Sequence, residues 1–62
     1  MKIIIEIDTD NAAFEENVGA EISRILRKLA TDIDTEEDFD DGFSKPLNDI
    51  NGNTCGSIRT EE

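Results

Sequence analysis

The spacing of apolar residues between positions 18 and 33 predicts one long amphipathic helix. Six apolar side chains recur at intervals of three and four residues, which places them on one helix face. They are Val18, Ile22, Ile25, Leu26, Leu29 and Ile33. Arg24, Arg27 and Thr31 lie on the opposite face. Asn17 is a suitable N-cap, so we expect the helix to begin there and to end near Ile33.

A strict two-residue alternation near the N-terminus predicts a β-strand over residues 2–8. Ile3, Ile5 and Ile7 fall on one face of this strand, whereas the other face carries charge together with Ile4. Turn-forming residues follow at positions 8–11. Phe14 is then expected to pack beside the start of the helix.

Residues 43–60 predict a β-hairpin. Asn51-Gly52 is typical of a type I′ turn, because both central positions of that turn need positive φ. The resulting register places Leu47 opposite Gly56, where the missing side chain is expected to let the helix approach closely. The same register assigns Ile50 and Cys55 to the other face of the hairpin.

These elements predict an α+β fold with the order β-α-β-β. One helix packs on a three-stranded sheet that ends in the Asn-Gly hairpin, and residues 1–62 form a single domain. Pro46 cannot donate a ladder hydrogen bond, which favours an edge position for its strand. The pattern leaves the order of the strands in the sheet open.

Charge is the most unusual property of the chain. Sixteen acidic residues against six basic residues give a formal net charge of −10. This balance disfavours direct binding to nucleic acid and to anionic membranes, and it favours a basic partner. Many of the carboxylates fall within residues 32–42, which are predicted to form an acidic, solvated loop that Phe39 or Phe43 anchors to the core. Solubility alone is the alternative explanation of the acidity.

The residue types argue against catalysis and against a resident metal or cofactor. The chain has no histidine, a single cysteine and four scattered glycines, so His-based catalysis, a zinc site and a phosphate-binding loop are not expected. Two alternating acidic or amide runs, at 32–36 and 49–53, depart from a calcium-binding loop. The first has Glu37 at the glycine position and Phe43 at the final glutamate position, and the second has Gly52 in the wrong place and no such glutamate, so at most a weak divalent-cation site is expected. Arg24, Arg27 and Lys28 are interpreted as a solvated basic stripe.

Two surfaces are therefore candidates for protein binding. The first is an acidic rim whose carboxylates would stand where phosphates sit in a basic groove, and its members are Asp8, Asp10, Glu15, Glu16, Asp34, Glu36, Glu37, Asp38, Asp40 and Asp41. The second is the uncovered face of the sheet, where Ile4, Ile50 and Cys55 would form a homodimer contact. The lone thiol of Cys55 is equally typical of a small buried residue in a reducing compartment.

Three stretches give the chain a resemblance to small acidic proteins encoded by bacteriophages and prophages. They are residues 8–15 (DTDNAAFE), residues 25–27 (ILR), and residues 49–53 (DINGN) followed by Gly56. The resemblance implies a protein that acts in the host bacterial cytoplasm, and no activity is assigned to that group.

Together, the charge and the resemblance lead to the hypothesis of a non-enzymatic inhibitor. It would bind a basic host protein or nucleoprotein complex of the anti-CRISPR or anti-restriction kind, as a DNA mimic. The alternatives are a homodimeric accessory or structural phage protein and a regulator of host transcription.

Overall fold

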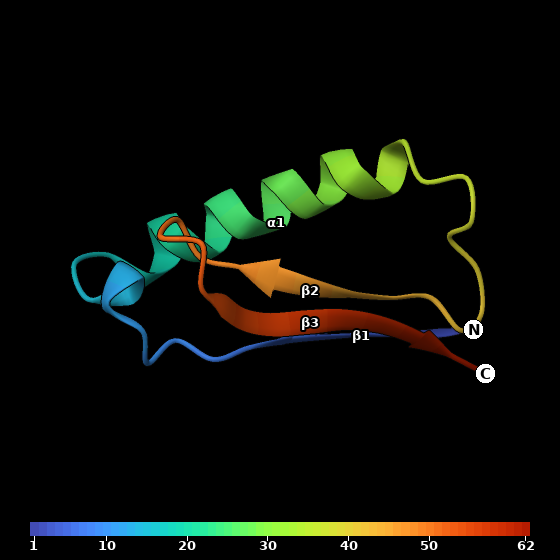
Figure 1. The fold of residues 1–62 in the computed structure, drawn as a ribbon, viewed down its shortest axis with the longest axis horizontal. Helices are drawn as coiled ribbons and strands as arrows, with labels where there is room; N and C mark the ends of the chain where they lie inside the picture. Colours follow the sequence, from blue (N-terminus) through green and yellow to red (C-terminus); the bar gives the residue numbers. More distant parts are fainter.

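The computed structural model describes all 62 residues and has the predicted order of elements (Figure 1). Strand β1 spans Lys2–Ile7 and is followed by a short 3-10 turn, Ala12–Phe14. Helix α1 spans Val18–Asp34, strand β2 spans Ser44–Asn48 and strand β3 spans Thr54–Glu61. The α+β class, with one helix over a three-stranded sheet, is confirmed.

The sheet is antiparallel and has the order β1-β3-β2. β3 is the central strand, so β1 and β2 both lie at edges. Pro46 therefore occupies an edge strand, as predicted, and its missing N–H disrupts no central ladder. Figure 1 shows α1 lying along one face of this sheet, with both chain termini at one end of the molecule.

The N-terminus of α1 forms as its sequence predicts. The side chain of Asn17 accepts a hydrogen bond from the Ala20 N–H at 2.9 Å, which satisfies one of the free N–H groups of the first turn. The apolar stripe is only partly covered, however. Ile25 and Leu29 are buried, whereas Val18 and Leu26 remain exposed because the helix turns its Arg24 side toward β2.

The core lies between α1 and the sheet, and the 3-10 turn closes one end of it. Phe14 is 1% exposed and Ile58 is fully buried. Phe14 thus plugs the start of the helix as predicted. Leu47 and Cys55 complete the core from the hairpin.

The hairpin turn differs from the predicted type I′ turn. Within the turn only Gly52 has positive φ (86°), and Asn51 does not, since no non-glycine residue of the chain does. The Gly52 N–H donates to the Asp49 carbonyl at 3.0 Å, and the Asp49 N–H donates to the Asn53 carbonyl at 2.8 Å. The loop is therefore one residue longer than a type I′ turn, with Gly52 in the left-handed position that ends a three-residue hairpin loop.

A bulge near Cys55 compensates for this longer loop. The register shifts between Leu47, which faces Gly56, and Asn48, which faces Thr54. The predicted opposition of Leu47 and Gly56 is thus correct, although the predicted turn is wrong. The bulge also turns Cys55 into the core, and the closest neighbour of Gly56 is the β1 backbone at Glu6, not the helix as expected.

Candidate functional site

Four carboxylates are held in the fold by hydrogen bonds, and most of the basic side chains form their ion pairs with them. The four are Glu6, Glu21, Asp32 and Asp49. Three of them form ion pairs that engage four of the six basic residues, leaving only Lys2 and Arg27 without an ion pair. The surface charge that remains is therefore almost entirely negative.

Glu21 joins the start of α1 to the hairpin turn. It is only 7% exposed. The Arg24 guanidinium donates to both of its carboxylate oxygens at 2.9 and 3.0 Å, and the Ile50 N–H donates to Oε2 at 2.8 Å. The hydrogen bond from Arg24 lowers the pKa of Glu21, although burial acts in the opposite direction. Arg24 is thus a structural residue, whereas Arg27 and Lys28 of the predicted basic stripe are exposed, as expected.

Asp49 organises the hairpin turn from within. Its Oδ1 accepts the N–H groups of Asn51 and Asn53, both at 2.9 Å, and its Oδ2 accepts the side-chain amide of Asn11 at 3.0 Å. Burial raises the pKa of Asp49, but these hydrogen bonds outweigh burial and hold the pKa below its usual value. The alternating Asp49, Asn51 and Asn53 therefore serve the turn itself, and no cluster of three or more metal-ligating side chains is found in the chain.

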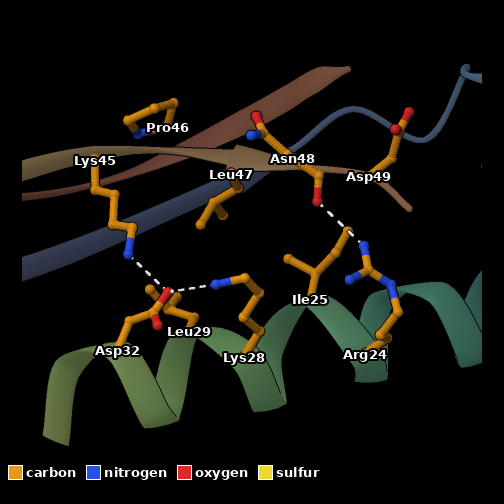
Figure 2. Close-up of a pocket in the computed structure, with 10 residues that line it drawn as sticks. All are labelled: Arg24, Ile25, Lys28, Leu29, Asp32, Lys45, Pro46, Leu47, Asn48 and Asp49. Atoms are coloured by element: carbon orange, nitrogen blue, oxygen red, sulfur yellow. Dashed lines mark hydrogen bonds and ion pairs between the residues drawn. The ribbon is translucent and has the colours of Figure 1, made fainter. Parts of the chain in front are cut away.

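A cleft of about 140 Å³ lies between α1 and β2 (Figure 2). Asp32 accepts hydrogen bonds from Lys45 at 2.6 Å and from Lys28 at 3.2 Å, and Lys45, followed by Lys28, lowers its pKa. At the other end of the cleft, the Arg24 guanidinium donates to the Asn48 carbonyl at 3.2 Å. Figure 2 shows Leu47 pointing between these contacts toward the helix. The Lys45–Asp32 ion pair and the hydrogen bond from Arg24 to Asn48 thus fasten α1 to β2 at the two ends of the cleft.

All ten residues of the predicted acidic rim are exposed and form no ion pair. They do not form one surface, however. Figure 1 shows the segment around the 3-10 turn and the loop after α1 at opposite ends of the molecule, whose longest axis is 35 Å. We call the group beside the 3-10 turn the turn cluster; it comprises Asp8, Asp10, Glu15 and Glu16. We call the group at the end of α1 and on the loop that follows it the loop cluster; it comprises Asp34, Glu36, Glu37, Asp38, Asp40 and Asp41.

The loop cluster is denser than the turn cluster, and it is anchored. The predicted loop over residues 32–42 begins later than expected, because residues 32–34 form the last turn of α1. Phe39 and Phe43 pack against the core with their ring centroids 5.0 Å apart. The buried Thr60 hydroxyl donates to the Asp40 carbonyl at 2.5 Å and accepts the Phe43 N–H at 2.9 Å. The loop backbone is thus held at Asp40 and Phe43, where it meets the end of β3.

The predicted homodimer face is not assembled. Ile4 lies on the uncovered side of the sheet, as expected, and pairs with Arg59 near the end of β3. Ile50 instead lies in the hairpin turn that precedes β3, so the two side chains are far apart along the strand. Cys55 is a core residue because the bulge directs its side chain inward. Burial, with Asp49 and Glu21 nearby, also raises the pKa of the Cys55 thiol. The expectation of packing is therefore correct for Cys55, and the expectation of a surface contact is wrong.

Exposed apolar side chains gather elsewhere, along the β1 side of the helix. Ile3 is 50% exposed, Ile5 is 43% exposed and Leu26 is 39% exposed. Ile3 and Ile5 share the sheet face of Ile58, the face on which α1 packs, since Ile5 pairs directly with Ile58. The sequence placed both isoleucines on the apolar face of the strand and did not reveal that they stay exposed.

Comparisons of the chain with protein-family models, with curated proteins and with solved structures each found no match. The resemblance to phage-encoded proteins thus stays a prediction. None of the helices has the length and apolarity needed to span a membrane.

Proposed function

We propose that this chain is a non-enzymatic inhibitor, of the kind that bacteriophages encode, which binds a nucleic-acid-handling host complex. The loop cluster would be the binding surface, and the target would be a CRISPR or restriction assembly. The observation that carries the proposal is the loop cluster itself, in which six exposed carboxylates without ion pairs stand on the last residue of α1 and on the anchored loop that follows it.

The density of charge on this loop is comparable to that of a nucleic-acid strand. The loop cluster places six carboxylates within residues 34–41. A fully extended chain advances about 3.4 Å per residue, so the mean spacing of these charges is at most a few ångströms, of the same order as the ~3.4 Å axial spacing of phosphates along one DNA strand. A groove lined with Lys and Arg that holds phosphates would therefore also attract this loop.

The anchoring of the loop favours binding, because a flexible acidic segment would lose conformational entropy when it binds. The Thr60 hydrogen bonds and the two phenylalanine rings already fix residues 39–43. The cost of ordering this part of the loop is thus met during folding, which favours affinity. Repulsion among the carboxylates opposes the fold, so a solubilising role alone would not require them to be crowded on an anchored loop.

The test is affinity capture from bacterial lysate with two charge-reversed variants. The first reverses the loop cluster: Asp34→Lys, Glu37→Lys, Asp38→Lys and Asp41→Lys. The matched control reverses the turn cluster: Asp8→Lys, Asp10→Lys, Glu15→Lys and Glu16→Lys. Each variant replaces four carboxylates by four lysines, so both carry the same net charge. Circular dichroism checks that both remain folded.

We expect the wild-type chain and the turn-cluster variant to capture the same nucleic-acid-binding complex. Added DNA should displace it, and binding should weaken steeply between 0.1 M and 1 M salt, as the Debye length falls from about 10 Å to about 3 Å. The loop-cluster variant should lose the complex. Equal capture by the two variants, or capture that DNA does not compete with, would contradict the proposal. Capture of RNA polymerase or of a repressor would instead favour the transcription alternative.

A further inference from the structure

The outer edge of β1 is open, and its only protective residues are the charged side chains of Lys2 and Glu6 near its two ends. β1 pairs only with β3, so its other edge faces solvent. It contains three consecutive isoleucines and no proline, whereas the opposite edge strand, β2, carries Pro46. Edge strands of soluble proteins normally avoid such flat apolar sequences because they offer a template for pairing with another chain.

The two flanks of α1 differ in the same way as the two edge strands: the flank toward β2 is closed, and the flank toward β1 is open. The ion pair of Asp32 with Lys45 and the hydrogen bond from Arg24 to the Asn48 carbonyl fasten its β2 flank to the sheet. Leu26 lies on the other flank, by helical geometry, and is exposed like Ile3 and Ile5. The β1 side of the molecule is therefore apolar and uncovered, while the β2 side is closed.

The ladder alternation shows which backbone groups of β1 are free. The Asp8 N–H donates to the Cys55 carbonyl at 2.7 Å, continuing the β1–β3 register by one residue. Backbone groups alternate in direction along an antiparallel strand, so Glu6, Ile4 and Lys2 also turn toward β3. The N–H and C=O groups of Ile3, Ile5 and Ile7 therefore point to the open edge.

We propose that β1 pairs antiparallel with β1 of a second copy of this chain, about a two-fold axis at Ile4. Ile3 of each copy then faces Ile5 of the other copy, and their free backbone groups form the hydrogen-bonded pairs. Lys2 of each copy faces Glu6 of the other. Lys2 forms no ion pair within its own chain, and Glu6 is exposed and uses one oxygen toward Arg59 at 2.6 Å.

Charge complementarity indicates that a second copy of the chain pairs with the β1 edge, and it also selects the register of that pairing. Moving the axis to Ile3 would place Ile4 against Lys2 of the second copy, and moving it to Ile5 would place Ile4 against Glu6 of the second copy. Only the axis at Ile4 pairs opposite charges with each other and isoleucines with each other throughout residues 2–6. In the resulting six-stranded sheet, the second copy also covers the exposed side chains of Ile3 and Ile5 on the face where α1 packs.

The dimer brings the loop cluster of one copy near the turn cluster of the other, because the two copies of β1 run in opposite directions. These acidic groups repel each other. Self-association should therefore strengthen as salt rises and screens the repulsion, whereas partner binding through the loop cluster should weaken. The dimer does not depend on the proposed function, and the opposite salt responses distinguish the failure of one from the failure of the other.

Disulfide trapping tests the register directly. With the axis at Ile4, the two Ile4 residues form a non-hydrogen-bonded pair with a Cα separation of about 4.5 Å, which a disulfide can bridge. We expect Ile4→Cys to give a covalent dimer under mild oxidation. The matched control Glu6→Cys should not, because Glu6 faces Lys2 of the other copy. The wild-type chain, whose Cys55 is buried, provides the background.

Sedimentation equilibrium tests the association without crosslinking. The wild-type chain should show a monomer–dimer equilibrium that shifts toward dimer at high salt, and Lys2→Glu should weaken it about tenfold by creating two like-charge contacts. Adding Glu6→Lys to Lys2→Glu should restore the dimer, with circular dichroism confirming folding. A wild-type chain that stays monomeric at high salt, or equal crosslinking of Ile4→Cys and Glu6→Cys, would overturn the proposal.

Discussion

Two Gly→Ala substitutions should change the stability of this fold in opposite directions. A Cβ added at Gly56 would overlap the carbonyl oxygen of Glu6 and press on the Ile7 Cα, both of which are backbone atoms. Neither can move without shifting β1 against β3. A Cβ added at Gly19, in the first turn of α1, would meet only the Asn17 side chain at 3.6 Å, which is an ordinary contact.

The magnitudes follow from these contacts. Overpacking that forces backbone to shift costs about 1–3 kcal/mol, so Gly56→Ala should lower the free energy of unfolding by that amount. Gly19→Ala removes the entropic cost of glycine in a helix and should raise the free energy of unfolding by up to about 1 kcal/mol. A domain of this size shifts its Tm by about 4–8 °C per kcal/mol, so the two variants should melt at clearly different temperatures.

Thermal and urea unfolding followed by circular dichroism measure this difference. Both variants make the same chemical change, so effects of glycine on the unfolded chain largely cancel in the comparison. A Gly56→Ala variant as stable as the wild-type chain would refute the close approach of β1 to β3. A destabilised Gly19→Ala variant would refute the described start of α1.

Two further predictions concern ionisable groups. Folding lowers the pKa values of Glu21, Asp32 and Asp49, so these carboxylates stabilise the fold at pH values above the ordinary carboxyl pKa of about 4. This stability should be lost as the pH falls through the lower pKa values of the folded state. Urea midpoints measured across acid pH check the loss, and Asp49→Asn should make the decline less steep. Burial and a raised pKa should make the Cys55 thiol react slowly with a thiol reagent in the native protein and rapidly in denaturant, whereas rapid native labelling would place Cys55 outside the core.

Local patterns were sufficient to predict the elements of this fold. The strand alternation at residues 2–8, the helix stripe and the Asn17 cap depend on neighbours in sequence, and the structure confirms each of them. The hairpin turn depends on more distant groups. Asp49 is held by Asn11 and lies beside the Glu21 network, and its carboxylate fixes the loop by binding two N–H groups. Neither the longer loop nor the bulge that buries Cys55 follows from the Asn-Gly pair alone.

The division of the acidic rim illustrates a different kind of miss. All ten carboxylates are exposed, but their arrangement depends on how far apart the fold holds them. A helix of 17 residues separates Glu16 from the residues beyond Asp34, and it spans about 25 Å. The predicted helix length therefore already implied two clusters. In contrast, the exposure of Ile3 and Ile5 depends on the lateral placement of α1 over β2, which the apolar pattern does not encode.

The distribution of charge in the finished fold explains why one molecule supports two proposals with opposite salt dependence. Most basic side chains form ion pairs near the contacts of α1 with β2 and of β1 with β3. The two ends of the molecule therefore carry carboxylates that have no basic partner. The β1 edge lies between those ends, and its single lysine and single glutamate complement a second copy. At low salt, the ends attract basic partners and hold copies of the chain apart. At high salt, screening removes both effects, and the apolar edge then controls association. A salt titration that weakened self-association and partner binding together would contradict this division of roles.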